Sequence, residues 1–154
     1  MSMIDPYKAK EAIDHLSKGV QLNEVADYFL NGMSQILQTT DYASKGVRAT
    51  KAGPLALDIS TPHGSVICNV EHVRMGSDLA ARLTFVATGK DVAGNTTGRN
   101  ILTVVVTADW FVERIDETPL PQSGRFGSAA RSDDVIIDVS VLVFIALQGS
   151  LTEI

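Results

Sequence analysis

The spacing of apolar residues changes once along this chain, and that change constrains the fold more than any other feature. Between Leu22 and Leu37 apolar residues recur every three or four positions, as they do on one face of an α-helix. From Gly53 onward they alternate with polar residues, which is the period of strands in a sheet with one covered face. A helical segment followed by a run of strands predicts an α+β fold.

The helical part is expected over residues 5–40 as a hairpin of two helices. Asp5 can accept hydrogen bonds from free backbone N–H groups at a helix start, and Pro6 suits the first helical position because it has no N–H to satisfy. Gly19 is a suitable left-handed stop for the first helix. The second helix is expected to begin around Asn23 and to carry the apolar face.

The sheet is expected over residues 53–148 as a five-stranded antiparallel meander, with the helical hairpin packed on one of its faces. The predicted strands cover residues 54–60, 65–74, 79–88, 101–115 and 135–147. A chain of 154 residues is long enough for one hydrophobic core and short for two. Residues 1–154 are therefore expected to form a single domain.

The stretch GKDVAGNTTGRN, residues 89–100, contains the residue types found in phosphate-binding loops. A Walker-type loop places Gly-Lys-Ser/Thr at its end and leads into a helix. Here Gly89 and Lys90 come first, and a predicted strand follows the loop. We therefore interpret the stretch as the tip of a long β-hairpin.

The last predicted strand, within DVIIDVSVLVFIALQ, is apolar on both faces, unlike the half-polar strands before it. In a meander it lies at the edge of the sheet, where an open apolar strand would recruit other chains. Because two short helices can cover only one sheet face, we expect a second copy of the chain to cover the other. The sequence thus predicts a homo-oligomer, a dimer or tetramer, with an interface of Val135, Ile137, Val139, Val141, Val143 and Ile145.

Residues 116–134 are expected to form a long loop rich in Pro, Gly and Ser, and loops of this length are usually functional or disordered. Arg125, Phe126 and Arg131 give this loop a basic and aromatic character in an acidic protein. The loop is a candidate contact for a protein partner. The alternative is a plain connector.

Net charge and hydropathy exclude two classes of partner. The net charge of −5 argues against nucleic-acid binding, which requires clustered Lys and Arg to displace counterions. The local group of Lys45, Arg48 and Lys51 is interpreted as a solvated connector. No apolar run reaches the ~18 residues needed to cross a bilayer, so no membrane contact is expected.

Cysteine and histidine usage points away from metal chemistry. Cys68 is the one cysteine of the chain, which is typical of a reducing compartment, and we expect a cytoplasmic location. It lies on the apolar side of its predicted strand, a core position. His15, His63 and His72 lack the spacings that place metal ligands on one helix face, so neither a metal nor a cofactor is expected.

Two carboxylates are candidates for catalysis. Asp109 and Asp138 each interrupt an apolar strand, and a carboxylate in an apolar cavity can act as a general base. The alternative is a pair of cross-strand ion pairs, Asp109 with Arg82 and Asp138 with Arg114.

Two functions from different classes fit these patterns. The first is a non-enzymatic oligomeric binding or assembly module, an adaptor or chaperone-like protein, that acts through an apolar sheet surface and the 116–134 loop. The second is a small-molecule-binding domain or an isomerase/dehydratase-like domain of helix-plus-curved-sheet type, with a pocket between helix and sheet and Asp109 or Asp138 as the base. The sequence contains no recognisable catalytic constellation, and this favours the first function.

Overall fold

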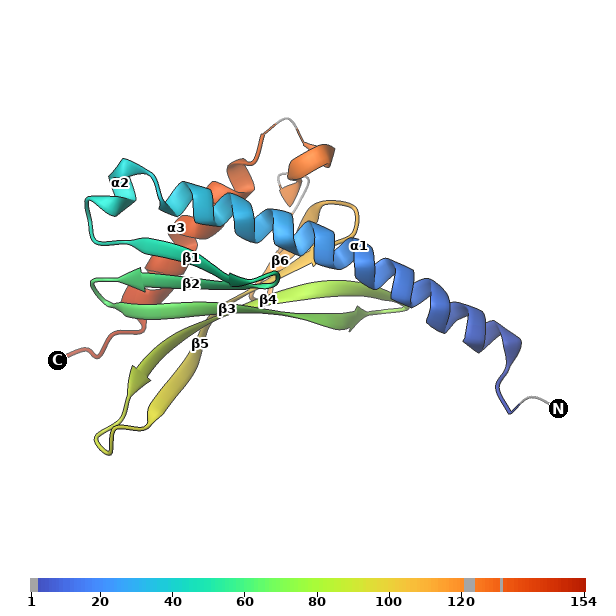
Figure 1. Cartoon of the computed structure of the whole chain (residues 1–154), viewed down its shortest axis with the longest axis horizontal. Coiled ribbons are helices and arrows are strands. Elements are labelled where there is room, and N and C mark those ends of the chain that lie inside the picture. The colour runs from blue at the N-terminus through green and yellow to red at the C-terminus, as the bar shows by residue number, and fades with distance from the viewer. Residues whose placement is uncertain (1–2, 121–123, 131) are drawn as a thin grey trace.

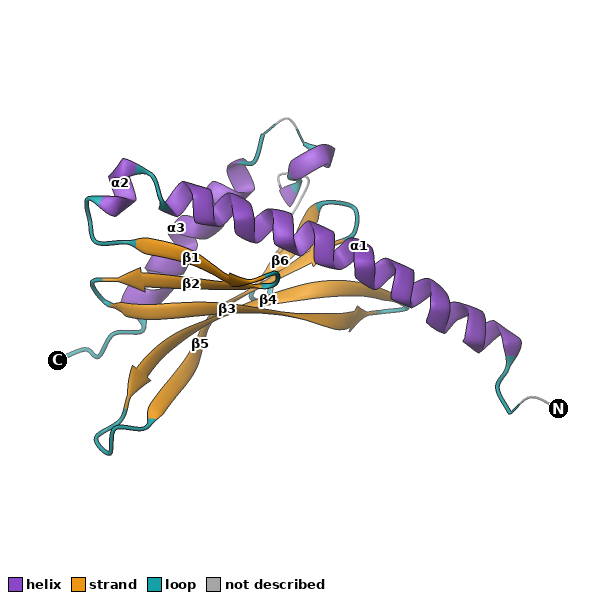
Figure 2. Ribbon diagram, viewed as in Figure 1, coloured by secondary structure: helices purple, strands orange, loops and turns teal. Residues whose placement is uncertain are grey.

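The computed structural model describes residues 3–120, 124–130 and 132–154. Two long helices lie on one face of an antiparallel sheet, as Figures 1 and 2 show. The helices are α1 (Pro6–Leu37), α2 (Thr40–Ala43), the 3-10 turn η2 (Gly127–Ala129) and α3 (Asp134–Gly149). The strands are β1 (Arg48–Gly53), β2 (Ala56–Thr61), β3 (Gly64–Met75), β4 (Asp78–Lys90), β5 (Thr96–Thr107), β6 (Phe111–Ile115) and β7 (Thr118–Pro119). The α+β class and the antiparallel sheet are confirmed.

The strands follow one another in the sheet in chain order, but the described residues form seven strands and not five. Strand β1 lies in the segment interpreted as a solvated connector, and the short β7 was not predicted. The predicted strand 101–115 is two strands, because the chain reverses between Thr107 and Phe111. At this turn Trp110 has a φ of 61°, and its N–H donates to the carbonyl oxygen of Thr107 at 3.2 Å.

The predicted helical hairpin is one continuous helix, α1. Its start is as expected: Asp5 is the N-cap residue and accepts a hydrogen bond from the Tyr7 N–H at 2.9 Å. Gly19 does not end a helix, because it lies buried within α1. A side chain there would place its Cβ 3.1 Å from Cε1 of His72, so the glycine allows α1 to lie close to β3.

The segment predicted as the last strand, residues 135–147, is part of helix α3. Its Val and Ile content favours a strand, but tertiary packing overrides such local propensities. In the helix, every fourth residue returns to the same side, and one side of α3 packs against α1 and β5. The predicted edge strand and its open edge are therefore wrong.

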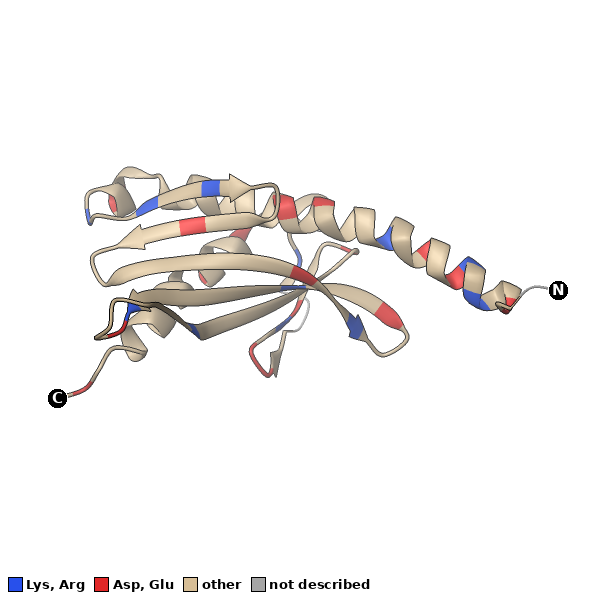
Figure 3. Ribbon diagram, turned by 60° about the horizontal axis from the view of Figure 1, so that its bottom comes forward, with Lys and Arg blue, Asp and Glu red and all other residues tan. Residues whose placement is uncertain are grey.

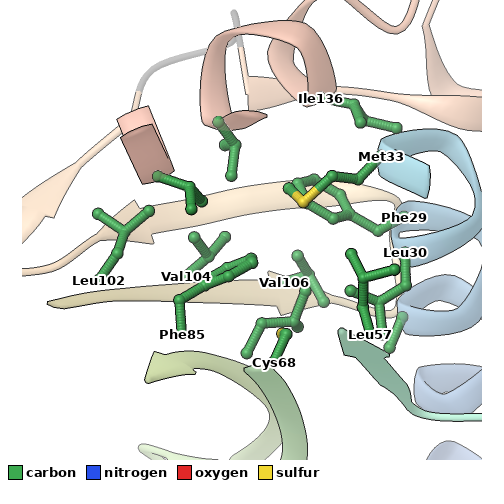
Figure 4. Packing of buried hydrophobic residues seen from close by; sticks show 14 of the residues in the cluster. Phe29, Leu30, Met33, Leu57, Cys68, Phe85, Leu102, Val104, Val106 and Ile136 are labelled. Atoms are coloured by element: carbon green, nitrogen blue, oxygen red, sulfur yellow. The ribbon is translucent and has the colours of Figure 1, made fainter. Parts of the chain in front are cut away.

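The core lies between the two helices and the facing side of the sheet. Figure 4 shows Phe29 and Met33 of α1, Ile136 of α3, and residues of β4 and β5 meeting there. All of these side chains are fully buried or nearly so. The opposite face of the sheet, here called the outer face, carries no helix in the described chain (Figure 3).

The glycine-rich stretch is the tip of the β4–β5 hairpin, as predicted. The turn is closed by Asp91, whose carboxylate accepts hydrogen bonds from the N–H groups of Ala93 and Asn95, both at 2.9 Å. Gly94 has a φ of 84°, a conformation that favours glycine. These turn N–H groups are bonded to Asp91, which agrees with a structural turn.

The first part of α1, residues 6–20, is called the arm. In Figure 1 most of the arm extends past the end of the sheet toward the N-terminus. At its base, Lys18 forms a 3.3 Å ion pair with Asp78 at the start of β4. The arm is therefore connected to the body at one end and surrounded by solvent along most of its length.

Candidate functional site

The outer side of α3 carries a line of exposed aliphatic side chains. Ile137, Val141 and Ile145 are 45%, 41% and 57% exposed, and their spacing of four residues places them along one side of the helix. We call these three residues the α3 stripe. The other side of α3 is packed into the core. A helix with apolar residues on both sides is typical of a helix that is covered on both sides.

This arrangement divides the six residues predicted as an interface into two groups. In a strand they would all point the same way, but residues two apart in a helix point to nearly opposite sides. Val135, Val139 and Val143 are buried in the core and are not available to a partner. The other three form the α3 stripe.

The arm carries a second exposed apolar line. Ile13, Leu16 and Val20 are 64%, 73% and 69% exposed, and we call them the arm stripe. Farther along α1, the same side of the helix carries the charged residues Glu24 and Asp27. The outer side of α1 therefore changes from apolar to polar where the helix meets the sheet. The sequence interpretation missed this stripe, although its three-and-four spacing is visible in the sequence.

Phe126, predicted to contact a partner, is a core residue. It is fully buried, and its ring packs edge-on against Phe29 and Trp110 at centroid distances of 5.2 and 6.0 Å. Its N–H donates to the carbonyl oxygen of Trp110 at 3.0 Å. The described part of the 116–134 loop is thus pinned to the body by a buried aromatic side chain, which corrects the expectation of a partner-binding aromatic.

Two arginines were predicted to lie on the same partner-binding surface, and the structure describes one of them. Arg125 is exposed, and its guanidinium group lies 5.6 Å from the ring centroid of Phe111. This is cation–π geometry. Arg131 lies outside the described residues.

Asp133 connects the loop to α1. Its carboxylate accepts a hydrogen bond of 2.7 Å from the Tyr28 hydroxyl and one of 2.8 Å from the Gly127 N–H. The hydrogen bond to Asp133 raises the pKa of Tyr28, with smaller contributions in the same direction from burial and from the charge of Asp133.

The two candidate bases lie apart and in contact with solvent. Asp109 is exposed in the turn between β5 and β6, and Asp138 is exposed on α3. An exposed carboxylate lacks the apolar surroundings that the general-base hypothesis requires. The predicted ion pairs are wrong as well. Arg82 pairs with Glu71 on the neighbouring strand, and Asp138 lies on a helix and not on a strand beside Arg114.

Cys68 and the side chains that could bind a metal give no candidate site in the described residues. Cys68 is fully buried, which confirms its predicted core position, and burial raises the pKa of its thiol well above the usual range. Within the described ranges, no three His, Cys, Asp or Glu side chains gather as metal ligands would. None of the helices described is both long and apolar enough to cross a bilayer.

Two hollows lie side by side on the outer face of the sheet. Their volumes are about 380 Å³ and about 410 Å³, and both are lined by Arg82 and Thr103. Arg114 lines the first hollow, and Thr84 and Val86 line the second. The small-molecule hypothesis placed its pocket between helix and sheet, on the other side of the strands.

Comparison of this chain with protein-family models, with curated proteins and with solved structures finds no match.

Proposed function

We propose that the protein is a non-enzymatic homo-oligomeric binding module that assembles through the α3 stripe and the arm stripe. The observation that carries the proposal is the α3 stripe. Helix α3 packs one apolar side into the core and presents a second apolar side to solvent. Exposed apolar lines on a helix mark surfaces that another protein surface covers.

The spacing of the α3 stripe suits contact with a second copy of itself. Side chains four residues apart form a ridge, and two such ridges interdigitate when helices cross at about −50°. In a symmetric dimer the same surface is used on both copies. Val141, the middle residue of the stripe, would then lie near the two-fold axis.

Charge favours an antiparallel crossing of the two α3 helices. Asp138 is exposed one turn before Val141. In a parallel arrangement the two Asp138 carboxylates would face each other across the interface, and like charges repel. In an antiparallel arrangement each carboxylate faces the apolar C-terminal part of the other helix's outer side, near its solvent-exposed rim.

The arm stripe supplies further apolar area. Three half-exposed aliphatic side chains bury only a few hundred Å², well below the ~800 Å² per partner of a specific interface. An assembly that also covers the arm stripe comes closer to that requirement. The proposal thus keeps the predicted oligomer and moves its working surface from a sheet edge to the two helices.

The proposal is tested by the mass of the assembly. Native mass spectrometry and light scattering of the wild-type protein should give a dimer or a tetramer at micromolar concentration. Val141→Asp, which places a charge at the centre of the α3 stripe, should give the mass of one chain. Gln35→Glu adds the same charge on the polar outer side of α1 and should leave the assembly intact.

The result that would contradict the proposal is a wild-type protein that stays monomeric, or a Val141→Asp variant that assembles like the wild type. Circular dichroism of Val141→Asp distinguishes lost assembly from lost folding, because Val141 is exposed and its replacement should preserve the helix content.

A further inference from the structure

One row of side chains crosses the outer face of the sheet. Glu71 in β3 faces Arg82 in β4, Arg82 faces Val105 in β5, and Val105 faces Arg114 in β6. Neighbouring strands are ~4.8 Å apart, so the Cα atoms of Arg82 and Arg114 are separated by about 10 Å. The two arginines therefore flank one small apolar side chain, and all three line the 380 Å³ hollow.

Arg82 is held in place by an acidic neighbour. Its Nε donates to Oε1 of Glu71 at 2.9 Å, and its Nη2 contacts the same oxygen. This pairing occupies one edge of the guanidinium group. The Nη1 donors on the other edge stay available, because a guanidinium group has five N–H donors.

Arg114 has no such neighbour. Its side chain is partly buried, and within the described part of the chain it makes no hydrogen bond and no ion pair. Asp116 and Glu117 also line the hollow, but neither forms an ion pair with Arg114. Oδ1 of Asp116 instead accepts hydrogen bonds from the N–H and the hydroxyl of Thr103 at 2.9 and 3.3 Å. A cation that is partly removed from water without an ion-pair partner is unfavourable.

We propose that this hollow binds a small organic anion, whose carboxylate or phosphate group lies between the guanidinium groups of Arg114 and Arg82. The planar guanidinium fork matches both groups and can donate two parallel hydrogen bonds to each. Val105 forms the floor beneath the anion. The body of the ligand extends into the adjoining 410 Å³ hollow, where Thr84 offers a hydroxyl and Val86 an apolar contact.

The site lies on the opposite side of the sheet from α1 and α3. It therefore does not depend on the proposed assembly through those helices, and either proposal can fail while the other holds.

The first experiment titrates the wild-type protein with inorganic phosphate and, separately, with hexanoate, against sodium chloride of equal ionic strength. Binding is followed by calorimetry and by the Nε–Hε signals of the arginine side chains in NMR spectra. Saturable binding of either probe that shifts the Arg114 signal is expected. Tighter binding of hexanoate would identify the ligand as a carboxylate with an apolar body. Tighter binding of phosphate would identify it as a molecule with a phosphate head group.

Variants locate the binding. Arg114→Gln should weaken it at least about tenfold, because charge-assisted hydrogen bonds are lost. Arg99→Gln is the matched control, since Arg99 lies at the hairpin end of β5 and donates to the Ser150 hydroxyl at 2.9 Å. Absence of saturation with both probes, or an equal loss in the two variants, would overturn the proposal.

A second variant separates ligand binding from a structural role. Arg114→Met keeps a long side chain and removes the charge. The proposal expects an unchanged or higher urea midpoint, together with loss of the response to both probes, because binding groups are often retained at the expense of stability. A variant that still binds the probes contradicts the proposal, and a lowered midpoint would show that Arg114 serves the fold and not a ligand.

Discussion

The N–H of Phe126 donates a hydrogen bond of 3.0 Å to the carbonyl oxygen of Trp110, and the rings of the two residues lie 6.0 Å apart at an angle of 67°. This contact joins the turn between β5 and β6 to the chain that leads into α3. It makes Phe126 a connection between the sheet and the C-terminal helix.

We expect Phe126→Ala to lower the free energy of unfolding by about 3–5 kcal/mol, the usual range for removing a buried aromatic ring. The exposed neighbour variant Arg125→Ala should change it by less than about 1 kcal/mol, because it removes one surface cation–π contact. Urea denaturation of both variants tests this. A loss below about 1 kcal/mol for Phe126→Ala would contradict the buried position.

Gly127 and Gly94 form a matched pair, because both have positive φ, of 61° and 84°. A Cβ on Gly127 would lie 2.4 Å from Cε3 of Trp110, whereas a Cβ on Gly94 meets open space. Gly94→Ala should cost about 1–2 kcal/mol, the strain of a left-handed conformation. Gly127→Ala should cost clearly more, since it adds the clash, and thermal unfolding of the two variants gives the comparison.

Tyr28 should titrate at higher pH than a solvated tyrosine, because its hydroxyl donates to Asp133. A raised folded-state pKa stabilises the fold at pH values below the unfolded-state pKa of about 10. That contribution is lost as the pH rises through the folded-state pKa. Ultraviolet titration should show a lower pKa for Tyr28 in Asp133→Asn, while Asp134→Asn should leave it unchanged.

Cys68 should be inert in the native protein. Burial both hides the thiol and raises its pKa, and the thiolate is the reactive form. Labelling with a disulfide reagent at mildly alkaline pH should therefore proceed only as fast as the protein opens, and it should accelerate sharply through the urea transition. Rapid labelling without denaturant would contradict the fully buried position.

The parts of the fold that were predicted correctly rest on local signals. Asp5 and Pro6 fix the start of α1, and alternation along residues 65–74 and 79–88 identifies β3 and β4. The tip between β4 and β5 follows from its order of glycine and lysine. In each case the neighbouring residues alone determine the structure.

The predictions that failed concern structure that depends on contacts between residues far apart in the sequence. Gly19 reads as a helix stop until the ring of His72 is known to lie against it. Residues 135–147 read as a strand because both strand and buried helix give an unbroken apolar run. The turn at Trp110 interrupts a perfect alternation, and its positive φ leaves no trace in residue type.

The predictions of the candidate sites divide in the same way, into local patterns that were recognised and long-range contacts that were not. The double apolar character of residues 135–147 was recognised correctly, but the wrong secondary structure placed Val135, Val139 and Val143 on the surface. The row of Arg82, Val105 and Arg114 was not recognised, because these residues belong to three strands and meet only through the register of the sheet.

The position of the arm outside the body affects how quickly its backbone amides exchange with solvent. Its backbone amides are bonded within a single helix, and isolated helices shorter than about 12–15 residues are only marginally stable in water. In a free chain the arm amides should therefore exchange with deuterium quickly, with protection rising at the Lys18–Asp78 pair. Covering the arm would slow this exchange without moving any strand, so amide exchange in the first turns of α1 would report whether another surface covers the arm.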